Sequence, residues 1–268
     1  MNLETDSCGP EPQPMVHKKK NEIAAADSAQ AYKETMNIVG RKEEIGTIRE
    51  HIRQGKSLHI YGPEGAGKSA LIDYVYRNWD EINTLRTPIY CKDSGSLEQI
   101  LSTIAKFLLS QGKKLVDIDY ERRTEKIILQ SDELPTVPRR YLRNMVFPHI
   151  KRGKFCIILD QLENVSQRTN SFLKALYGFT TVISVSRKSW DKTKIDFPDM
   201  LQYALWDISK LEVKNLDKEA AFSLMINVLN NSTTTKSTAC RRLFEEVYVT
   251  TQGNPKMIKE IFAKAMDQ

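Results

Sequence analysis

The sequence lacks long apolar runs, and it contains few of the residues that build disulfides or metal sites. No apolar run approaches the ~20 residues of a membrane-spanning helix, so we expect no membrane association. The 4 cysteines are scattered without a C-x-x-C pair, which argues against a disulfide framework or a zinc site. The 4 histidines are equally isolated. The polar first residues show no secretory signal, so we expect an intracellular protein, cytoplasmic or, in a eukaryote, nuclear.

The residues that the chain does contain are ordinary for a globular protein. Hydrophobic residues make up 40% and charged residues 28% of 268 positions, enough for one core and a small satellite domain. Residues 1–36 carry more acidic residues than lysines, so the net charge of +6 lies in the remainder and weakly favours a polyanionic partner. Early prolines and a glycine predict a flexible N-terminal tail over 1–36, in which the triplet Lys18–Lys20 is either a targeting or DNA-contacting arm or a solvated cluster.

The most informative segment follows the short apolar run 58–61. It fits G-x-x-x-x-G-K-[ST] and reads Gly62, Pro63, Glu64, Gly65, Ala66, Gly67, Lys68, Ser69 and then Ala70. Its glycines permit positive φ, so successive backbone N–H groups can point into one hollow for an anion, and the following helix adds its own N-terminal N–H groups. In such a loop Lys68 bridges the β- and γ-phosphates and the Ser69 hydroxyl ligates Mg²⁺. The segment therefore predicts a site for ATP or ADP with Mg²⁺.

A second motif is a buried strand that ends in an acid. The apolar run 155–159 is followed by Asp160, which we expect at the carboxyl edge of a parallel sheet, where such folds bind ligands. Beside a phosphate loop, this carboxylate would hold Mg²⁺ directly or through water. Ser69 and Asp160 are therefore the predicted metal ligands.

Three further residues are candidates for the hydrolysis step. Gln161 can orient water but cannot accept its proton, whereas Glu163 can accept it if the turn aims the carboxylate inward rather than to solvent. Arg187 ends another strand, where it would sense the γ-phosphate, contact a neighbouring subunit or be an ordinary surface arginine. With Lys68 and Asp160 these residues form the predicted catalytic set, and this set predicts slow turnover.

Strand and helix patterns alternate along the chain and then give way to helices. The strands are expected at 58–61, 87–92, 155–160, 181–187 and 206–213, and the final helices at 217–229, 238–249 and 255–266. Residues 113–137 read as charged and irregular, and a helix is expected at about 139–147. The pattern predicts an α/β three-layer sandwich with about five parallel strands and a C-terminal helical lid. The expected boundaries are 37–213 for the α/β core and 214–268 for the lid.

Together these motifs resemble the P-loop ATPases of the AAA+ class and their STAND relatives, over roughly residues 37–268. In this family a hydrophobic-Gly-Arg-x-x-Glu segment packs near the adenine, and the similar residues here are Ile38, Val39, Gly40 and Arg41. Residues 62–69 resemble Walker A and residues 155–160 resemble Walker B. Arg187 lies where the sensor-1 residue or the STAND arginine is found. The triplet 253–255 resembles the G-x-P of the lid, which implies that Pro255 approaches the nucleotide.

The sequence also departs from the active AAA+ pattern. Gln161 stands where the family has a glutamate, no sensor-2 arginine is evident in the lid, and Arg168 is the one candidate for an arginine finger. The resemblance therefore implies an ATP hydrolase with slow turnover. Short modules of this kind occur among archaeal-type ATPases, origin-recognition-like initiators, transposon target-selection ATPases and NB-ARC/NACHT-like switches, and the motifs do not decide between them.

A basic segment precedes the strand that carries Asp160. Residues 139–154 contain no acid and six basic residues, which are Arg139, Arg140, Arg143, Lys151, Arg152 and Lys154. Leu142, Met145 and Val146 would form the inward face of a helix, and we expect the patch toward the amino edge of the sheet, away from ATP. The segment is either a contact for the backbone of double-stranded DNA or a solvated basic face.

Two functions are consistent with these observations. The first is an ATP-binding switch that assembles as a homo- or hetero-oligomer, associates with DNA and recruits a partner protein, with slow hydrolysis. The alternative is a STAND-type nucleotide-gated signalling or scaffold module without a nucleic-acid role.

Overall fold

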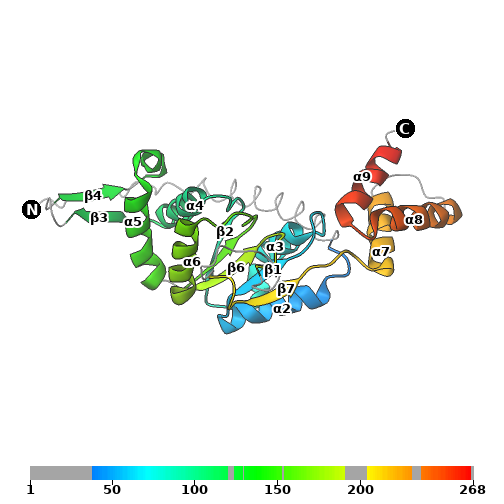
Figure 1. Ribbon diagram of the computed structural model, residues 1–268, viewed down its shortest axis with the longest axis horizontal. Coiled ribbons are helices and arrows are strands. Elements are labelled where there is room, and N and C mark those ends of the chain that lie inside the picture. The colour runs from blue at the N-terminus through cyan, green and yellow to red at the C-terminus, as the bar shows by residue number, and fades with distance from the viewer. Residues whose placement is uncertain are drawn as a thin grey trace, which may run out of the picture. The chain divides into compact units, whose positions relative to one another are not determined.

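The computed structural model describes residues 38–119, 124–128, 130–152, 154–190, 204–230 and 237–266 (Figure 1). The predicted tail over 1–36 lies outside the described residues. In the described part of the chain, no helix combines the length and the apolar character needed to cross a membrane.

A five-stranded parallel sheet forms the centre of the fold. Its strands are β1 (Leu58–Tyr61), β2 (Thr87–Cys91), β5 (Phe155–Leu159), β6 (Thr181–Val185) and β7 (Ser209–Glu212). The order is β2-β5-β6-β1-β7, and every neighbouring pair is parallel. The inner strands β1, β5 and β6 are short runs rich in isoleucine, valine and leucine, as expected for strands that are covered on both faces. The predicted α/β sheet is confirmed.

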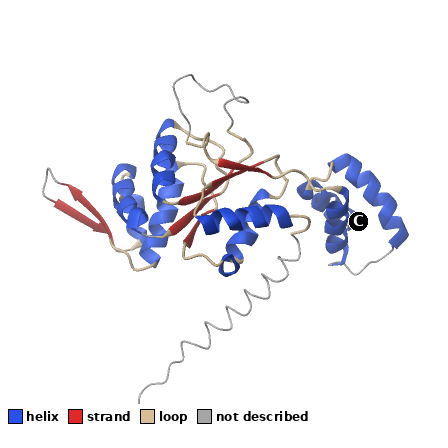
Figure 2. Cartoon of the chain, turned by 90° about the horizontal axis from the view of Figure 1, so that it is seen from below, coloured by secondary structure: helices blue, strands red, loops and turns tan. Residues whose placement is uncertain are grey.

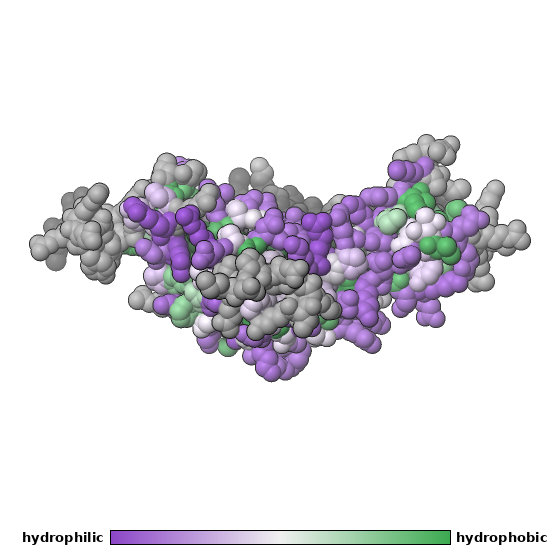
Figure 3. All heavy atoms as spheres, viewed as in Figure 1, coloured by the Kyte–Doolittle hydropathy of each residue, from purple (hydrophilic) through white to green (hydrophobic). Residues whose placement is uncertain are grey.

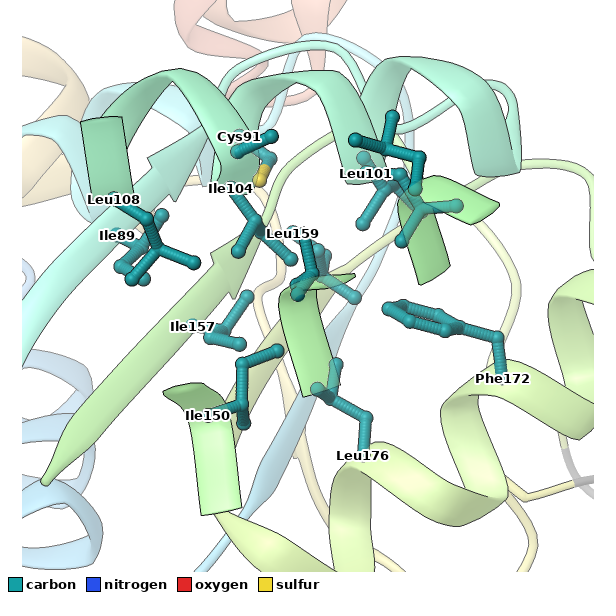
Figure 4. Packing of buried hydrophobic residues seen from close by; sticks show 14 of the residues in the cluster. Ile89, Cys91, Leu101, Ile104, Leu108, Ile150, Ile157, Leu159, Phe172 and Leu176 are labelled. Carbon is teal, nitrogen blue, oxygen red and sulfur yellow. The ribbon is translucent and has the colours of Figure 1, made fainter. Parts of the chain in front are cut away.

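Helices cover both faces of this sheet. One face packs against α2 (Lys42–Gln54) and α3 (Lys68–Arg77), with Ile60 and Ile183 among the buried residues. The other face packs against α4 (Leu97–Ser110), α5 (Arg139–Arg152) and α6 (Gln167–Phe179). Figure 4 shows Ile157 and Leu159 of β5 in the core between these helices. Residues of one strand alternate between the two cores because successive side chains point to opposite faces. A short 3₁₀ turn, η1 (Trp79–Ile82), follows α3.

The expectation that residues 113–137 are irregular was wrong. They contain an antiparallel pair, β3 (Leu115–Asp119) and β4 (Thr124–Ile128), followed by the 3₁₀ segment η2 (Ser131–Thr136) (Figure 2). Apolar and charged residues alternate over Val116–Asp119 of β3, whereas β4 begins with Thr-Glu-Lys and ends in two isoleucines. Leu115 pairs with Ile128, and both are fully buried in the core beside α4 and α5. The high charge of the segment obscured the two strands.

Helix α5 extends beyond its predicted end at about residue 147 and ends at Arg152. The apolar face continues through Ile150, which is fully buried, and this burial outweighs the break expected at Pro148. Pro148 and Asn144 are exposed on the opposite side of the helix. Because Pro148 has no N–H, the Asn144 carbonyl loses its helical hydrogen bond on the exposed side of the helix, where water can reach it.

Three helices end the chain, namely α7 (Lys218–Asn230), α8 (Ser237–Thr251) and α9 (Pro255–Met266). They enclose an apolar cluster of their own, which includes Leu224, Phe244 and Ile258. The Asp217 carboxylate caps α7 by accepting a hydrogen bond from the Ala220 N–H, at 2.8 Å. The boundary of a lid domain at residue 214 stays a prediction.

Candidate phosphate and metal site

The segment between β1 and α3 forms a loop whose glycines have conformations that other residues avoid. Gly65 and Gly67 have φ of 79° and 93°. At Gly62 an added Cβ would lie 2.1 Å from the Val213 carbonyl oxygen, and at Gly65 it would lie 2.4 Å from Asn254 Oδ1. The end of β7 and the start of α9 therefore pass directly against the loop, and only glycine leaves room for them.

Lys68 is folded back into this loop. Its Nζ donates hydrogen bonds of 2.8 Å to the carbonyl oxygens of Gly62 and Pro63, and the side chain is almost fully buried. Burial lowers the pKa of Lys68 from its ordinary value, and the nearby Glu163 and Asp160 carboxylates oppose that shift. A phosphate oxygen is a charged and stronger acceptor than a peptide carbonyl. The ammonium group is thus placed to exchange its carbonyl partners for phosphate.

Asp160 lies at the end of β5 and faces Ser69. Ser69 Oγ is 3.1 Å from Asp160 Oδ1, the Gln161 N–H donates to the same oxygen at 2.9 Å, and the Tyr90 hydroxyl donates to Oδ2 at 3.3 Å. Burial raises the pKa of Asp160, while these hydrogen bonds and the charge of Lys68 act to lower it. A hydroxyl and a carboxylate on facing elements are hard oxygen donors, which suit Mg²⁺ with several retained waters. The residues present therefore fit the predicted metal.

Tyr90 was not predicted from the sequence, because no motif marks it. It lies on β2 beside β5, opposite Ile158 in the strand register, and its ring centroid lies 5.0 Å from that of Tyr76. Burial and the negative charge of Asp160 raise the pKa of its hydroxyl, which therefore stays a hydrogen-bond donor. Only the strand order shows that β2 lies next to the strand of Asp160.

Glu163 and Arg187 form an ion-paired group beside the loop. The Arg187 backbone N–H donates to Glu163 Oε1 at 2.9 Å, and its Nε lies 3.3 Å from Glu163 Oε2. Arg187 Nη1 also pairs with Glu64 of the P-loop at 3.3 Å. Gln161 has a positive φ of 58°, and its side chain is exposed. Ser186 faces away from this group, since its hydroxyl contacts His59 and Trp190 in the interior.

The segment proposed to pack near adenine is fixed to both sides of the site. Ile38, Val39 and Gly40 lead into α2, and Val39 packs against the cluster of the C-terminal helices. Arg41 is nearly buried, and its Nη2 donates to the carbonyl oxygens of Ala66, at 2.9 Å, and Lys214, at 2.6 Å. This arginine therefore ties the entry segment to the P-loop.

The start of α9 is hydrogen-bonded to the P-loop. Asn254 Nδ2 donates to the Glu64 carbonyl oxygen at 2.8 Å, and the Lys256 N–H donates to the Gly65 carbonyl oxygen at 3.3 Å. Pro255 lies close to Gly67, where an added Cβ would be 4.0 Å from the proline Cγ. Asn254 and Lys256 were missed as site residues, although Asn254 stands inside the G-x-P triplet.

The basic residues before β5 are distributed along α5 rather than gathered at one edge of the sheet. Arg140, near the start of α5, lines the same hollow as Ser96, which lies beyond the carboxyl end of β2. Lys151 is near the other end of the helix, and Lys154 is exposed just before β5. The expectation that the whole patch lies toward the amino edge was wrong, because α5 runs along the height of the sheet. The side chains of Arg139 and Arg152 lie outside the described residues.

The fold and the loop define an α/β protein of the P-loop type, with helices after the last strand of the sheet. The sequence profile described as "AAA ATPase domain" matches residues 37–182, which is more than half of the chain. The chain therefore belongs to the AAA ATPase domain family.

Solved structures show the same fold. A Walker-type ATPase of Pyrococcus abyssi superposes with a TM-score of 0.52 at 17% identity, covering 82% of this chain and 66% of that one. A DNA replication initiation factor superposes with a TM-score of 0.53 at 17% identity, covering 84% of this chain and 61% of that one. This chain thus spans less than two thirds of each of them. No curated protein sequence matches it.

Proposed function

We propose that the chain is a slow, ATP-dependent molecular switch whose C-terminal helices respond to the nucleotide at the P-loop. The observation that carries this proposal is the pair of hydrogen bonds from Asn254 and Lys256 to the carbonyls of Glu64 and Gly65. Those carbonyls belong to the loop whose N–H groups would hold the phosphates. A phosphate that reorients the loop therefore changes the affinity of the loop for the start of α9.

Residues at the loop would hold both the phosphates and magnesium. Lys68 would hold the β- and γ-phosphates, and Ser69 and Asp160 would hold the ion. When bound, Mg²⁺ supplies positive charge that offsets the charge of the phosphates. Tyr90 orients the Asp160 carboxylate, because it donates a hydrogen bond to the oxygen that Ser69 does not contact.

The proposed slow hydrolysis is supported by the contacts of Glu163, the candidate base. Glu163 contacts the backbone N–H and the side chain of Arg187, so both of its oxygens are engaged by Arg187 rather than by an attacking water. A γ-phosphate competes for Arg187, and this competition would release Glu163 only when ATP is present. Gln161 cannot replace it as a base, because an amide does not accept the proton.

The output of the switch is assembly on DNA together with a partner protein. The support is the exposed cationic series on α5 and the likeness in fold to a DNA replication initiation factor. Phosphate contacts of this kind release counterions, so binding must weaken with salt. In the second candidate function, a STAND-type module, nucleic acid has no role. The ion pairs of Arg187 with Glu64 and Glu163 favour that alternative, because they suit a module that holds nucleotide rather than one that turns it over.

Particle sizing with Mg²⁺ and either ADP or ATP, in the presence and absence of duplex DNA, tests both functions. The proposal predicts a larger particle with ATP and a further salt-sensitive increase with duplex. Lys68→Ala should show neither increase. An ATP-dependent increase without any effect of duplex would leave the STAND-type function, and the absence of ATP binding would overturn both.

A further inference from the structure

A wide groove lies between α5 and α6, on the outer side of the two helices. Its volume is about 1450 Å³, and the segments after β2 and β5 close one end of it. Ser96 and Ser166 lie at that end, while Lys151 and Phe179, at the far ends of α5 and α6, lie at the other. Figure 3 shows strongly hydrophilic side chains next to hydrophobic ones in this region. The groove is larger than the ~300–1,000 Å³ of most small-molecule pockets, which points to a polymer.

The charges of the groove have one sign. Its lining includes Arg140, Arg143, Lys151 and Arg168 and no carboxylate among the described side chains. Within the part of the chain that the structure describes, none of these four forms an ion pair with an acidic side chain. Arg140 and Lys151 are separated by about 16 Å along α5, since a helix rises ~1.5 Å per residue. The groove thus presents a series of cations suited to an extended polyanion.

Aromatic rings alternate with these cations. The Arg140 guanidinium lies 4.5 Å from the ring centroid of Tyr141, and the Lys151 ammonium lies 4.3 Å from that of Phe179. Arg143 lies over Phe147 in the same way, at 5.3 Å. Phe179 is 44% exposed, and its ring also contacts that of Phe147. Cations beside partly exposed aromatic rings are a combination that holds the backbone and the bases of a single strand.

The groove also offers hydrogen-bonding groups. Pro148 lacks the N–H that would bond the carbonyl of Asn144, so that carbonyl has lost its helical donor. Asn144, Pro148 and Ser171 all line the groove. The Asn144 carbonyl and amide and the Ser171 hydroxyl can contact the pairing edges of bases, which in a duplex are turned toward the other strand.

The shape favours a single strand over a duplex. Proteins read duplex DNA by placing a convex element, such as a helix, into its major groove. Here the charged surface is concave and lies between two helices, so a rigid duplex would bridge it whereas a flexible strand can enter it. We propose that the groove between α5 and α6 binds single-stranded nucleic acid, with the cations on the phosphates and the aromatic rings on the bases. This inference rests on the proposed association with DNA and changes the form of nucleic acid that is bound.

Fluorescence anisotropy with a labelled oligothymidylate, full-length protein and low salt tests the proposal. Arg168→Glu should weaken binding about tenfold, by loss of one phosphate contact and addition of a repulsive charge. Lys174→Glu is the matched control, because Lys174 is exposed on the same helix but does not line the groove. It should change binding less than about twofold. Equal effects of the two variants would mean that only the net charge of the protein matters, which would overturn the assignment of the groove as the binding site.

The aromatic contribution is tested by Phe179→Ala and by Phe179→Trp. The alanine variant should weaken binding about tenfold, within the range measured for loss of base stacking, and the tryptophan variant should restore it. Far-UV circular dichroism shows whether each variant is folded. If both folded variants bind like the parent protein, the bases do not stack there and the proposal fails.

Competition distinguishes this inference from the proposed function. Unlabelled oligothymidylate should displace the probe far better than duplex of equal length or polyglutamate. Displacement by polyglutamate at equal concentration would show a site for acidic polymers, which overturns the inference. Duplex binding that depends on ATP, without oligothymidylate binding, would retain the proposed function and remove the inference. Lys68→Ala should still bind oligothymidylate, so the loss of ATP binding can be distinguished from the loss of oligonucleotide binding.

Discussion

The two sides of the candidate nucleotide site are built in different ways. On the inner side, Lys68 and Asp160 are nearly buried and held by hydrogen bonds of 2.8–3.3 Å to backbone and side-chain groups. On the outer side, Arg187, Glu64 and Lys256 are joined by ion pairs, and their side chains are 56%, 66% and 58% exposed. Exposed pairs contribute only ~0–1 kcal/mol, so the outer side can open at little cost. The inner-side residues that would hold phosphate and Mg²⁺ are therefore fixed, whereas the ion-paired residues of the outer side can move.

The largest effect is expected on the inner side, from Lys68→Ala. The ammonium would donate to two phosphates, and each hydrogen bond to a charged group contributes about 1.5–3 kcal/mol. We therefore expect ATP affinity to fall at least about 100-fold, measured by isothermal titration calorimetry. Lys113→Ala, at an exposed position outside the site, is the control and should leave the affinity unchanged. ATP binding of equal strength in Lys68→Ala would remove the P-loop from the proposed function.

The next largest effect is expected from Glu163→Gln, at the boundary between the inner and outer sides of the site. Glu163→Gln keeps the shape of the side chain and one oxygen that can accept from the Arg187 N–H, but it removes the base and the ion pair with Arg187. Turnover should fall about 100-fold, the lower range for loss of a general base, while ATP affinity holds. Phosphate release under saturating ATP measures this, with Glu212→Gln as a control at an exposed glutamate. Equal turnover would show that Glu163 is not the base and that its pairing with Arg187 is only structural.

Gly65→Ala tests how closely the loop and the start of α9 are fitted. The new Cβ would lie 2.4 Å from Asn254 Oδ1, at a φ of 79°. The conformation alone costs about 1–2 kcal/mol, so the midpoint of thermal unfolding should fall and the hydrogen bond from Asn254 should be lost. Gly46→Ala in α2 is the matched control, since nothing lies within 4 Å of its added Cβ. That variant should be neutral or stabilising by about 0.5–1 kcal/mol. Equal midpoints for the two variants would contradict the close fit.

The difference between local motifs and contacts made by distant segments explains what the sequence could predict. The P-loop and Asp160 were predictable, because their function depends on local features: glycines at set spacings, a helix start and a strand that ends in an acid. The five parallel strands were predictable as well, since buried strands appear as continuous apolar runs. Tyr90, Asn254 and Lys256 were not, because each reaches the site from a segment that only the folded chain brings there.

Two errors in the fold have related causes. The β3–β4 pair was missed because its charges suggested a loop, although Leu115 and Ile128 pair with each other and anchor the two strands in the core. The end of α5 was placed too early because Pro148 is a local break, whereas the burial of Ile150 is a tertiary effect. In both cases local composition was outweighed by burial that depends on distant segments.

A smaller effect is expected from Tyr90→Phe. The hydroxyl stabilises the charged form of Asp160, so its removal should raise the pKa of that carboxyl further above its ordinary value. If Asp160 must be ionised, the acidic limb of the pH profile of turnover shifts to higher pH, by at most about one unit. Turnover at neutral pH should fall less than about tenfold. An unchanged acidic limb would show that Tyr90 does not position Asp160.

The smallest effect is expected on the outer side, from Lys256→Ala. Its ammonium is 3.5 Å from Glu64 Oε1 in an exposed pair, so the free energy of unfolding should change by less than ~1 kcal/mol. The link to the P-loop should persist, because it is made by the Lys256 backbone N–H and by the Asn254 side chain. Asn254→Ala removes the side-chain link and the cap of α9, and it should weaken ATP-dependent assembly more than Lys256→Ala does. The reverse order would mean that the exposed charge, rather than the hydrogen bonds to the loop, transmits the state of the nucleotide.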